Sequence, residues 1–312
     1  MSHSKKALLL FLRLFIGVGM LLIAGAVTIQ AYPPLFPWAL ALFDGQSVCR
    51  PSDVLHGAAV RQAFNRERET LEKQLHLVRK DGQGYELWAY PGGEYWIPEG
   101  SQASLPIILA QQEANEYGDA MKGVQAGDIV LDCGAHVGIY TRKALAAGAK
   151  LVVAIEPAPA NLECLRRNLQ AEIADGRVIV CPKGVWDKEE ELPLFEEPDN
   201  SAADRFVAPT ANSVVKHVIP LTRIDTLAQE LGLPRVDFIK MDIKGATARA
   251  LRGGAATIRA SKPGLVISTE EDIDSFEEIR SVVLDVHGDY QTECGTCSVR
   301  DSRVWPEVVF FR

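Results

Sequence analysis

A strand–turn–helix–strand pattern near the middle of the chain constrains its fold more than any other feature. Ile129–Asp132 and Leu151–Glu156 are apolar runs that each end in a carboxylate, with a glycine-containing turn and a helix between them. Near-continuous apolar strands of this kind are typical of a parallel sheet with both faces covered. Gly134 and Gly138 allow a ligand to approach the backbone closely, and the following helix directs its N-terminus at that ligand. The pattern therefore predicts a nucleoside-binding pocket in an α/β sheet.

The spacing of the acidic residues narrows the kind of ligand. Glu156 lies 24 residues after Asp132, where a carboxylate that binds a ribose diol is expected. The dinucleotide fingerprint is not met, since only two glycines are present, four residues apart, and an acid precedes the first. The pattern D-x-G-A-x-x-G is similar to the first motif of S-adenosylmethionine-dependent methyltransferases, whose ligand has no pyrophosphate. The same kind of turn also occurs in α/β proteins that bind nothing there, and this alternative stays open.

The chain beyond residue 104 continues this alternation of apolar strands and amphipathic helices. Further strands are expected at 177–181, 236–242 and 264–268, helices at 157–176, 221–231, 246–259 (weakened at Gly253 and Gly254) and around 276–283, and a terminal hairpin strand at 304–311. The acidic segment 189–201 is expected to be a surface loop. Together these elements predict a mostly parallel sheet that binds ligands at the carboxyl ends of its strands.

Smaller elements are expected before residue 104. Ala58–Lys80 has apolar residues at near-helical spacing, which predicts an amphipathic helix closed by Gly82. Tyr85–Tyr90 and Glu94–Ile97 flank a Pro-Gly-Gly turn and predict a β-hairpin.

The N-terminal region predicts a membrane anchor. Ala7–Ile29 is an apolar stretch of 23 residues, interrupted only by Arg13, Thr28 and glycines. As a helix it would span roughly 35 Å at ~1.5 Å per residue, enough to cross a lipid bilayer. We therefore expect residues 7–29 to form a single transmembrane helix. A cleaved signal peptide is the alternative, since Lys5 and Lys6 precede the apolar stretch.

The distribution of basic residues predicts the orientation of this anchor. Lys5, Lys6 and Arg13 lie on its N-terminal side, and no further Lys or Arg occurs before Arg50. By the positive-inside rule the N-terminus stays in the cytoplasm, and the globular domain lies on the non-cytoplasmic, periplasmic side. S-adenosylmethionine is made in the cytosol, so this orientation separates the domain from the ligand that its motif predicts.

Composition argues against other classes of protein. The formal net charge of −8 argues against nucleic-acid binding, which needs a basic surface. The six cysteines are ordinary usage for this length, and the six histidines show no metal-ligand pairing, so no metal site is predicted. Cys294 and Cys297 have redox or zinc spacing, but too few ligands lie near them for zinc. We interpret them as ordinary loop cysteines, with a disulfide as the alternative if the domain is exported.

A long, ordered set of motifs from about Tyr85 to the C-terminus resembles the FkbM family of methyltransferases. It includes D-C-G-A-H-V-G from Asp132, I-E-P around Glu156, P-K-G-V-W-D ending at Asp187, and V-D-F-I-K-M-D-I-K-G-A around Asp242. The resemblance implies a Rossmann-like seven-stranded α/β methyltransferase fold and O-methylation with S-adenosylmethionine as cofactor. We accordingly expect a membrane anchor (1–32), a linker with the amphipathic helix and β-hairpin (33–103), and a methyltransferase-like domain (104–312).

The resemblance also implies roles for single residues. Glu156 would accept hydrogen bonds from both ribose hydroxyls, because a carboxylate offers two acceptor oxygens. Asp187 would lie near the adenine, and Asp242 would face the transferred methyl group as the candidate catalytic base. For Asp242 a carboxylate that caps the Gly245 turn is the open alternative. The remaining cofactor-binding residues, on the methionine and ribose side, would be Asp132, Gly134, His136 and Gly138.

The chain departs from the family pattern where the chemistry takes place. The family usually reads D-x-E-G-A-E after the fourth strand, and this chain has Lys244 and Thr247 in place of the two glutamates. After the fifth strand it has Ser268-Thr269-Glu270-Glu271, where family members often carry an aromatic–His pair. A lysine in place of a glutamate changes the local charge by two units and disfavours a bound cation.

Two functional hypotheses follow. The first is a membrane-anchored O-methyltransferase that uses S-adenosylmethionine on an acceptor the sequence does not identify, and it rests on the Asp132–Gly138 turn with Glu156. The second is a catalytically impaired methyltransferase fold that serves as a structural subunit of a membrane protein complex on the non-cytoplasmic side. It rests on Lys244, Thr247 and Glu270 and on the predicted exported orientation.

Overall fold

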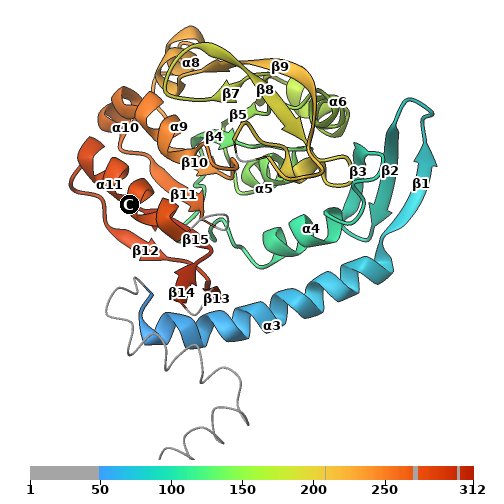
Figure 1. Ribbon diagram of the computed structural model, residues 1–312, viewed down its shortest axis with the longest axis horizontal. Helices are drawn as coiled ribbons and strands as arrows, with labels where there is room; N and C mark the ends of the chain where they lie inside the picture. Colours follow the sequence, from blue (N-terminus) through green and yellow to red (C-terminus); the bar gives the residue numbers. More distant parts are fainter. Residues whose placement is uncertain (1–48, 208, 270–272, 301–302) are drawn as a thin grey trace, which may run out of the picture. The chain divides into compact units, whose positions relative to one another are not determined.

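The computed structural model describes residues 49–207, 209–269, 273–300 and 303–312 of the chain (Figure 1). The predicted membrane segment 7–29 lies outside these residues, and among the described residues no helix is both long and apolar enough to cross a bilayer. The described chain divides into two units. The smaller unit holds residues 49–59 and Cys297–Trp305, and the larger unit holds Val60–Thr296 and Pro306–Arg312.

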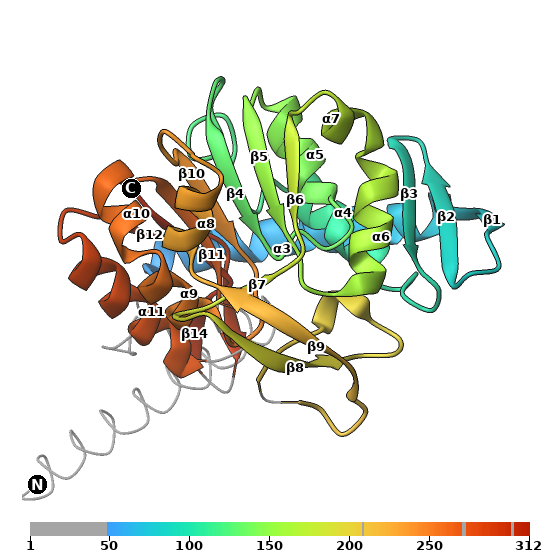
Figure 2. The ribbon, with the colours of Figure 1, turned by 90° about the horizontal axis from the view of Figure 1, so that it is seen from above.

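A seven-stranded sheet forms the centre of the larger unit (Figure 2). Its strands are β4 (Ile129–Cys133), β5 (Leu151–Ile155), β6 (Val178–Cys181), β10 (Phe238–Met241), β11 (Gly264–Ser268), β12 (Thr292–Cys294) and β15 (Val308–Phe311). Numbered along the chain, they lie in the order 3-2-1-4-5-7-6. The first five pair in parallel, and β15 runs antiparallel to both of its neighbours. The prediction of a mostly parallel α/β sheet is confirmed.

Helices cover both faces of this sheet, as parallel crossovers require. On one face lie α4 (Leu105–Glu113), α5 (Ile139–Ala146) and α6 (Pro159–Asn168), and on the other lie α8 (Ile224–Glu230), α9 (Thr247–Gly253), α10 (Ala255–Ser261) and α11 (Ile273–Val286) (Figure 2). The helix predicted at 157–176 divides into α6 and a short α7 (Gln170–Ala174). The helix predicted at 246–259 is broken at its glycines. A Cβ on Gly253 would lie 1.9 Å from the carbonyl oxygen of Trp186, so only glycine fits there.

An antiparallel sheet of three strands precedes α4 in the chain. It consists of β1 (His76–Lys80), β2 (Tyr85–Tyr90) and β3 (Gly93–Pro98), and its last two strands are the predicted β-hairpin. The helix predicted at 58–80 has the wrong limits, because α3 spans Pro51–Gln74 and residues 76–80 form β1. Strand β1 satisfies its backbone hydrogen bonds along β2, and the periodicity of a single segment does not reveal such a partner.

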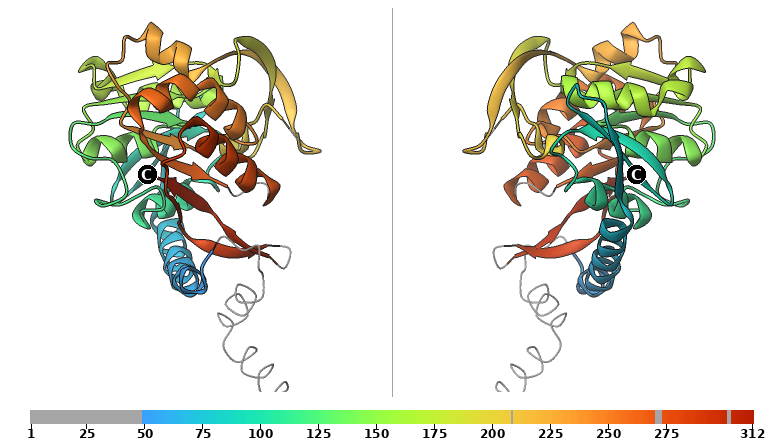
Figure 3. Two further views of the ribbon diagram at one scale, coloured as in Figure 1. Left: turned by 90° about the vertical axis from the view of Figure 1, so that its left-hand side faces the viewer. Right: turned by 90° about the vertical axis from the view of Figure 1, so that its right-hand side faces the viewer.

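The acidic segment predicted as a loop at 189–201 is mostly a strand. β8 (Glu190–Glu196) pairs antiparallel with β9 (Val214–Thr222), which also pairs parallel with β7 (Gly184–Val185). Leu194 is fully buried, so this acidic strand packs inward through its apolar residue. The two long strands form a curved hairpin that stands out from the larger unit (Figure 3). The helix predicted to begin at residue 221 begins at Ile224, since residues 221 and 222 belong to β9.

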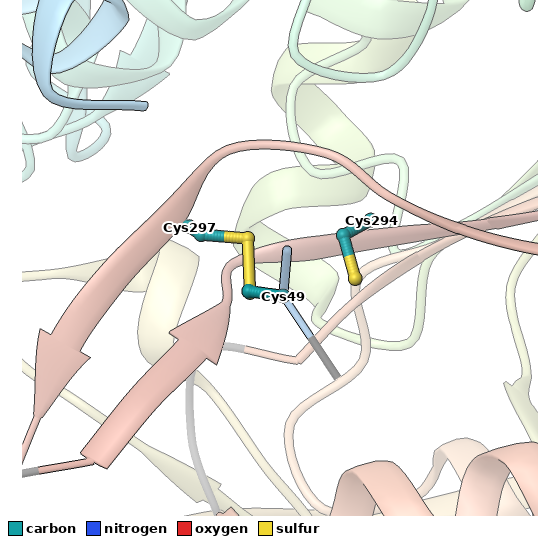
Figure 4. Close-up of side chains that lie close together, drawn as sticks. All are labelled: Cys49, Cys294 and Cys297. Atoms are coloured by element: carbon teal, nitrogen blue, oxygen red, sulfur yellow. A yellow bond between two sulfur atoms is a disulfide. The ribbon is translucent and has the colours of Figure 1, made fainter. Parts of the chain in front are cut away.

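The smaller unit contains most of a hairpin formed by β13 (Cys297–Arg300) and β14 (Arg303–Pro306). The strand predicted at 304–311 therefore divides into β14 and β15. Cys297 forms a disulfide with Cys49 (Figure 4), so the interpretation of Cys297 as an ordinary loop cysteine is wrong. Spacing could not identify the pair, because 248 residues separate the two cysteines.

The turn after β4 depends on a glycine with no room for a side chain. Gly134 has φ +80°, and a Cβ there would lie 2.1 Å from the carbonyl oxygen of Asp242 at the end of β10. Gly176 has a similar φ of +73°, but a Cβ there would meet nothing within 4 Å. We expect Gly176→Ala to lower the free energy of unfolding by about 1–2 kcal/mol, the cost of the left-handed conformation. Gly134→Ala should lower it by about 1–3 kcal/mol more, the usual cost of overpacking.

Urea unfolding of the full chain in detergent, followed by circular dichroism, measures both values. If Gly134→Ala and Gly176→Ala lower the free energy of unfolding equally, β4 and β10 do not approach each other as described.

Candidate functional site

A cavity of about 430 Å³ opens at the carboxyl ends of β4, β5 and β10. The strand order reverses between β4 and β10, and open α/β sheets bind ligands at such a point. The volume lies in the usual range of small-molecule sites, about 300–1,000 Å³. Of the predicted site residues, Gly134, His136, Glu156 and Asp242 line the cavity, whereas Asp132, Gly138 and Asp187 do not.

The turn after β4 has left-handed backbone at three positions. Gly134, His136 and Gly138 have φ of +80°, +50° and +89°. Gly138 caps the N-terminus of α5, and a Cβ there would lie 2.7 Å from a methyl carbon of Leu169. This glycine therefore serves packing behind the turn. His136 is an uncommon non-glycine residue in this conformation, which aims its backbone N–H at Glu156.

Asp132 is fully buried beneath the turn and makes an ion pair with Lys240 of β10. The Lys240 Nζ lies 3.1 Å from Asp132 Oδ1 and donates a hydrogen bond of 2.8 Å to the carbonyl oxygen of Gly134. The hydroxyl of Thr141 donates to the other carboxylate oxygen at 2.7 Å. Asp132 thus holds the turn in place from behind. Lys240 lines the cavity and was not predicted as a site residue.

Glu156 turns its carboxylate toward the turn and is 5% exposed. Its Oε2 accepts a hydrogen bond of 2.8 Å from the backbone N–H of His136. Its Oε1 accepts from the backbone N–H of Ala158 at 3.0 Å and from the Asn161 Nδ2 at 3.2 Å. Burial raises the pKa of Glu156, and these three hydrogen bonds oppose that rise. Because a carboxylate has about four acceptor positions, Oε2 keeps one for a ligand.

Two further acceptors beside Glu156 have no partner within the part of the chain that the structure describes. These are Asn161 Oδ1 and His136 Nδ1, both buried atoms of residues that line the cavity. Burial, together with the charge of Lys240, lowers the pKa of His136 to about 4, so its ring is neutral at neutral pH. The His136 Nε2 lies 3.0 Å from Ser201 Oγ, and a proton on Nε2 leaves Nδ1 as an acceptor. Acceptors grouped in this way fit the two hydroxyl donors of a ribose.

Asp242 lies at the other end of the cavity between an aromatic hydroxyl and a cation. Its Oδ2 accepts a hydrogen bond of 3.0 Å from Tyr117, and its Oδ1 lies 3.4 Å from the Lys244 Nζ. Burial works against ionisation here. The charges of Lys244 and Lys240 and the Tyr117 hydrogen bond outweigh it and lower the pKa of Asp242 to about 2. An efficient general base has a pKa near the working pH, so this carboxylate is a weak proton acceptor.

Asp187, predicted near the adenine, lies outside the cavity lining. Its Oδ2 makes an ion pair of 3.0 Å with Arg249, whose guanidinium carbon lies 4.9 Å from the ring centre of Trp186. Arg249 belongs to α9, so Asp187 joins the loop after β7 to that helix. Its place favours a structural role over contact with a ligand.

Residues 200–206 also line the cavity. Ser201 anchors this segment: its carbonyl oxygen accepts from the Asn161 Nδ2 at 3.0 Å, and its N–H donates to Ser101 Oγ at 3.2 Å. Burial, with the negative charges of Glu156 and two nearby glutamates, raises the pKa of Asp204 to about 8. No motif marks this segment in the sequence, because its contacts are with residues 40 and 100 positions away.

The sequence profile of the Methyltransferase FkbM domain matches residues 132–295, which is more than half of the chain. The chain belongs to this family. The predicted resemblance is therefore confirmed, and the profile assigns the chain to a family of methyltransferases. No curated protein matches the sequence.

Several solved structures are similar at low identity. A methyltransferase FkbM from Methylobacillus flagellatus KT is 18% identical, with a TM-score of 0.47 over 84% of this chain and 60% of that protein. This chain thus spans less than two thirds of that protein. A putative methyltransferase from Streptococcus mutans in complex with SAH is 11% identical, with a TM-score of 0.37 over 64% of this chain and 96% of that one. A putative RNA methyltransferase from Pyrococcus horikoshii is 13% identical, with a TM-score of 0.36 over 80% and 96% of the two chains.

The raised pKa of Asp204 makes stability depend on pH. Its ordinary value is 3.8 and its folded value about 8, so between these values the folded state keeps a proton that the unfolded chain releases. This contribution to stability is complete below about pH 4 and is lost as the pH rises to about 8. Asp204→Asn keeps an acceptor for the Glu197 N–H but carries no charge. It should raise the melting temperature at pH 8.5 by several degrees more than at pH 5.

Thermal unfolding at the two pH values measures this difference. The matched control is Asp289→Asn, whose carboxylate is 85% exposed and should show the same melting temperature as the wild type at both. A gain from Asp204→Asn that does not change with pH would contradict the prediction.

Proposed function

We propose that this chain is an S-adenosylmethionine-dependent O-methyltransferase anchored in the lipid bilayer by residues 7–29. The observation that carries the proposal is the set of buried acceptors, Glu156, Asn161 and His136, that face one cavity at the strand-order reversal. Membership of the FkbM family supports it. The acceptor substrate is not identified, because the cavity walls offer no single chemistry that selects one.

Residues at one end of the cavity would bind the cofactor, and residues at the other end would bind the acceptor. S-adenosylmethionine supplies an electrophilic methyl group when it is bound. Glu156 and Asn161 would accept the ribose hydroxyls, and the neutral ring of His136 would add an acceptor without repelling a cation. At the other end, the ionised Asp242 and the Tyr117 hydroxyl would orient the acceptor hydroxyl by hydrogen bonds. The Lys244 ammonium would stabilise negative charge on that oxygen.

Binding of S-adenosylhomocysteine tests this proposal directly. We expect the full chain in detergent to bind it in the micromolar range by calorimetry. Glu156→Ala should weaken binding roughly 30-fold, since the one hydrogen bond that the ionised Oε2 has left for the ligand, worth about 2 kcal/mol, is lost. Glu156→Gln keeps the size of the side chain, and its melting temperature shows whether the turn is still folded. The control is Glu277→Ala, at a carboxylate that is 63% exposed.

Absence of binding to the folded wild-type chain would remove the proposal. Equal affinity of the wild type and Glu156→Ala for S-adenosylhomocysteine would show that Glu156 does not bind the ribose.

A second function has its own support. The ion pair with Lys244 helps to hold the pKa of Asp242 near 2, so Asp242 is a weak base. Among the described residues that line the cavity, Asp242 is the only carboxylate at that end that is placed to act as a base. The alternative is therefore a catalytically impaired methyltransferase fold that serves as a structural subunit of a membrane protein complex on the non-cytoplasmic, periplasmic side. The predicted orientation of the anchor, with the N-terminus in the cytoplasm, agrees with this alternative.

Topology and co-purification distinguish the two functions. A reporter that works only outside the cytoplasm, fused after Arg312, should be active if the domain is exported. A pull-down from detergent-solubilised membranes should then recover the same membrane proteins with the wild type and with Asp242→Asn, because a structural role needs no catalytic carboxylate. Activity of only a cytoplasmic reporter would count against the structural subunit.

A further inference from the structure

The cysteine pair of the smaller unit lies outside the candidate site and has no part in the proposed chemistry. Cys49 and Cys297 are bonded to each other, with their Cα atoms 6.4 Å apart (Figure 4). This separation lies within the usual range for disulfides, about 4.4–6.8 Å, so the backbone is placed for the bond. Cys49 comes 20 residues after the predicted membrane segment 7–29.

The surroundings of this disulfide are those of a structural bond. Cys49 is 2% exposed and Cys297 is 4% exposed. The first turns of α3 pack against them: Val54 is 1% exposed, and a Cβ on Gly57 would lie 2.6 Å from the carbonyl oxygen of Cys297. Labile, regulatory disulfides are typically exposed, whereas both of these cysteines are buried. Burial of this kind keeps reductants away from the sulfur atoms.

Three of the other cysteines contrast with this pair. Cys133, Cys164 and Cys181 lie in the core of the larger unit, and burial raises the pKa of each thiol. They are therefore inert thiols that serve packing. Thiol pairs in the cytosol stay reduced, whereas disulfides persist in exported compartments.

We propose that Cys49–Cys297 is a structural disulfide that forms after the globular part of the chain has reached an oxidising, non-cytoplasmic compartment. The two thiols lose two protons and two electrons as the S–S bond forms. A thiol–disulfide oxidoreductase of that compartment accepts them, and its own disulfide becomes a dithiol. The bond closes a covalent loop that contains every residue from Arg50 to Thr296. Residue 49 is thereby fixed to β13 whatever the cavity binds.

The number of thiols in the cell tests the proposal on the full chain. Cells are quenched with acid, and the denatured protein is labelled with maleimide-polyethylene glycol with or without prior reduction. The reduced wild type should carry two more labels than the unreduced one. Cys49→Ser and Cys297→Ser should each abolish this difference, and the matched control Cys294→Ser should keep it. The first two variants should also melt several degrees lower than the control.

Two results would overturn the pairing. One is a wild type with equal label numbers in both samples. The other is a difference that Cys294→Ser abolishes and Cys49→Ser keeps, which would assign the bond to Cys294 and Cys297.

The compartment is tested separately, in anaerobic cells that lack the thiol oxidant of the exported compartment. In these cells the wild type should carry the same number of maleimide labels with and without prior reduction. A disulfide that still forms in these cells would contradict the assignment to an exported compartment. None of these outcomes depends on ligand binding, so the proposed function stands or fails apart from them.

Discussion

The buried ion pair between Lys240 and Asp132 is the contact on which the site depends. The two residues face each other in register on the parallel strands β10 and β4, and their side chains are 5% and 0% exposed. The same ammonium group donates to the carbonyl oxygen of Gly134, so one cation joins both strands and the turn. Loss of one partner from such a pair costs about 3–5 kcal/mol, because the other charge is left buried and uncompensated. This contact therefore joins the turn that lines the cavity to β10.

The same cation also acts on groups that line the cavity. It lies 5.4 Å from the ring centre of Tyr117, and its charge helps to lower the pKa of both His136 and Asp242. Asp132 pairs with this cation, so the charge beneath the cavity is largely balanced. The neutral His136 avoids adding a further charge beside the acceptors of the ribose end. A single buried lysine thus contacts the turn and also contributes to the pKa shifts of His136 and Asp242.

The parts of this structure that the sequence predicts are those in which local pattern and tertiary role agree. Apolar strands such as β4 and β5 are recognisable because both faces of a parallel sheet are buried. The turn is recognisable because only glycine tolerates the approach of β10 to residue 134. Lys240 was missed because a lysine within an apolar strand gives no sign of its partner on another strand. The β8–β9 hairpin was missed because residues 197–213 separate its two strands in the sequence.

The two ends of the cavity differ in how well they suit a methyl donor. The ribose end offers neutral or anionic acceptors, whereas at the other end two ammonium groups are each paired with a carboxylate, Lys240 with Asp132 and Lys244 with Asp242. A sulfonium ion is a cation, and the two paired carboxylates offset the repulsion that these ammonium groups exert on it. This end of the cavity is therefore compatible with a bound methyl donor, provided that the donor reaches the site. The compartment that we propose for the Cys49–Cys297 disulfide bears on this access, because S-adenosylmethionine is made in the cytosol. An oxidised pair in the living cell would leave the acceptor-lined cavity without a local source of its ligand, and the fold would then be kept for its surface and its stability.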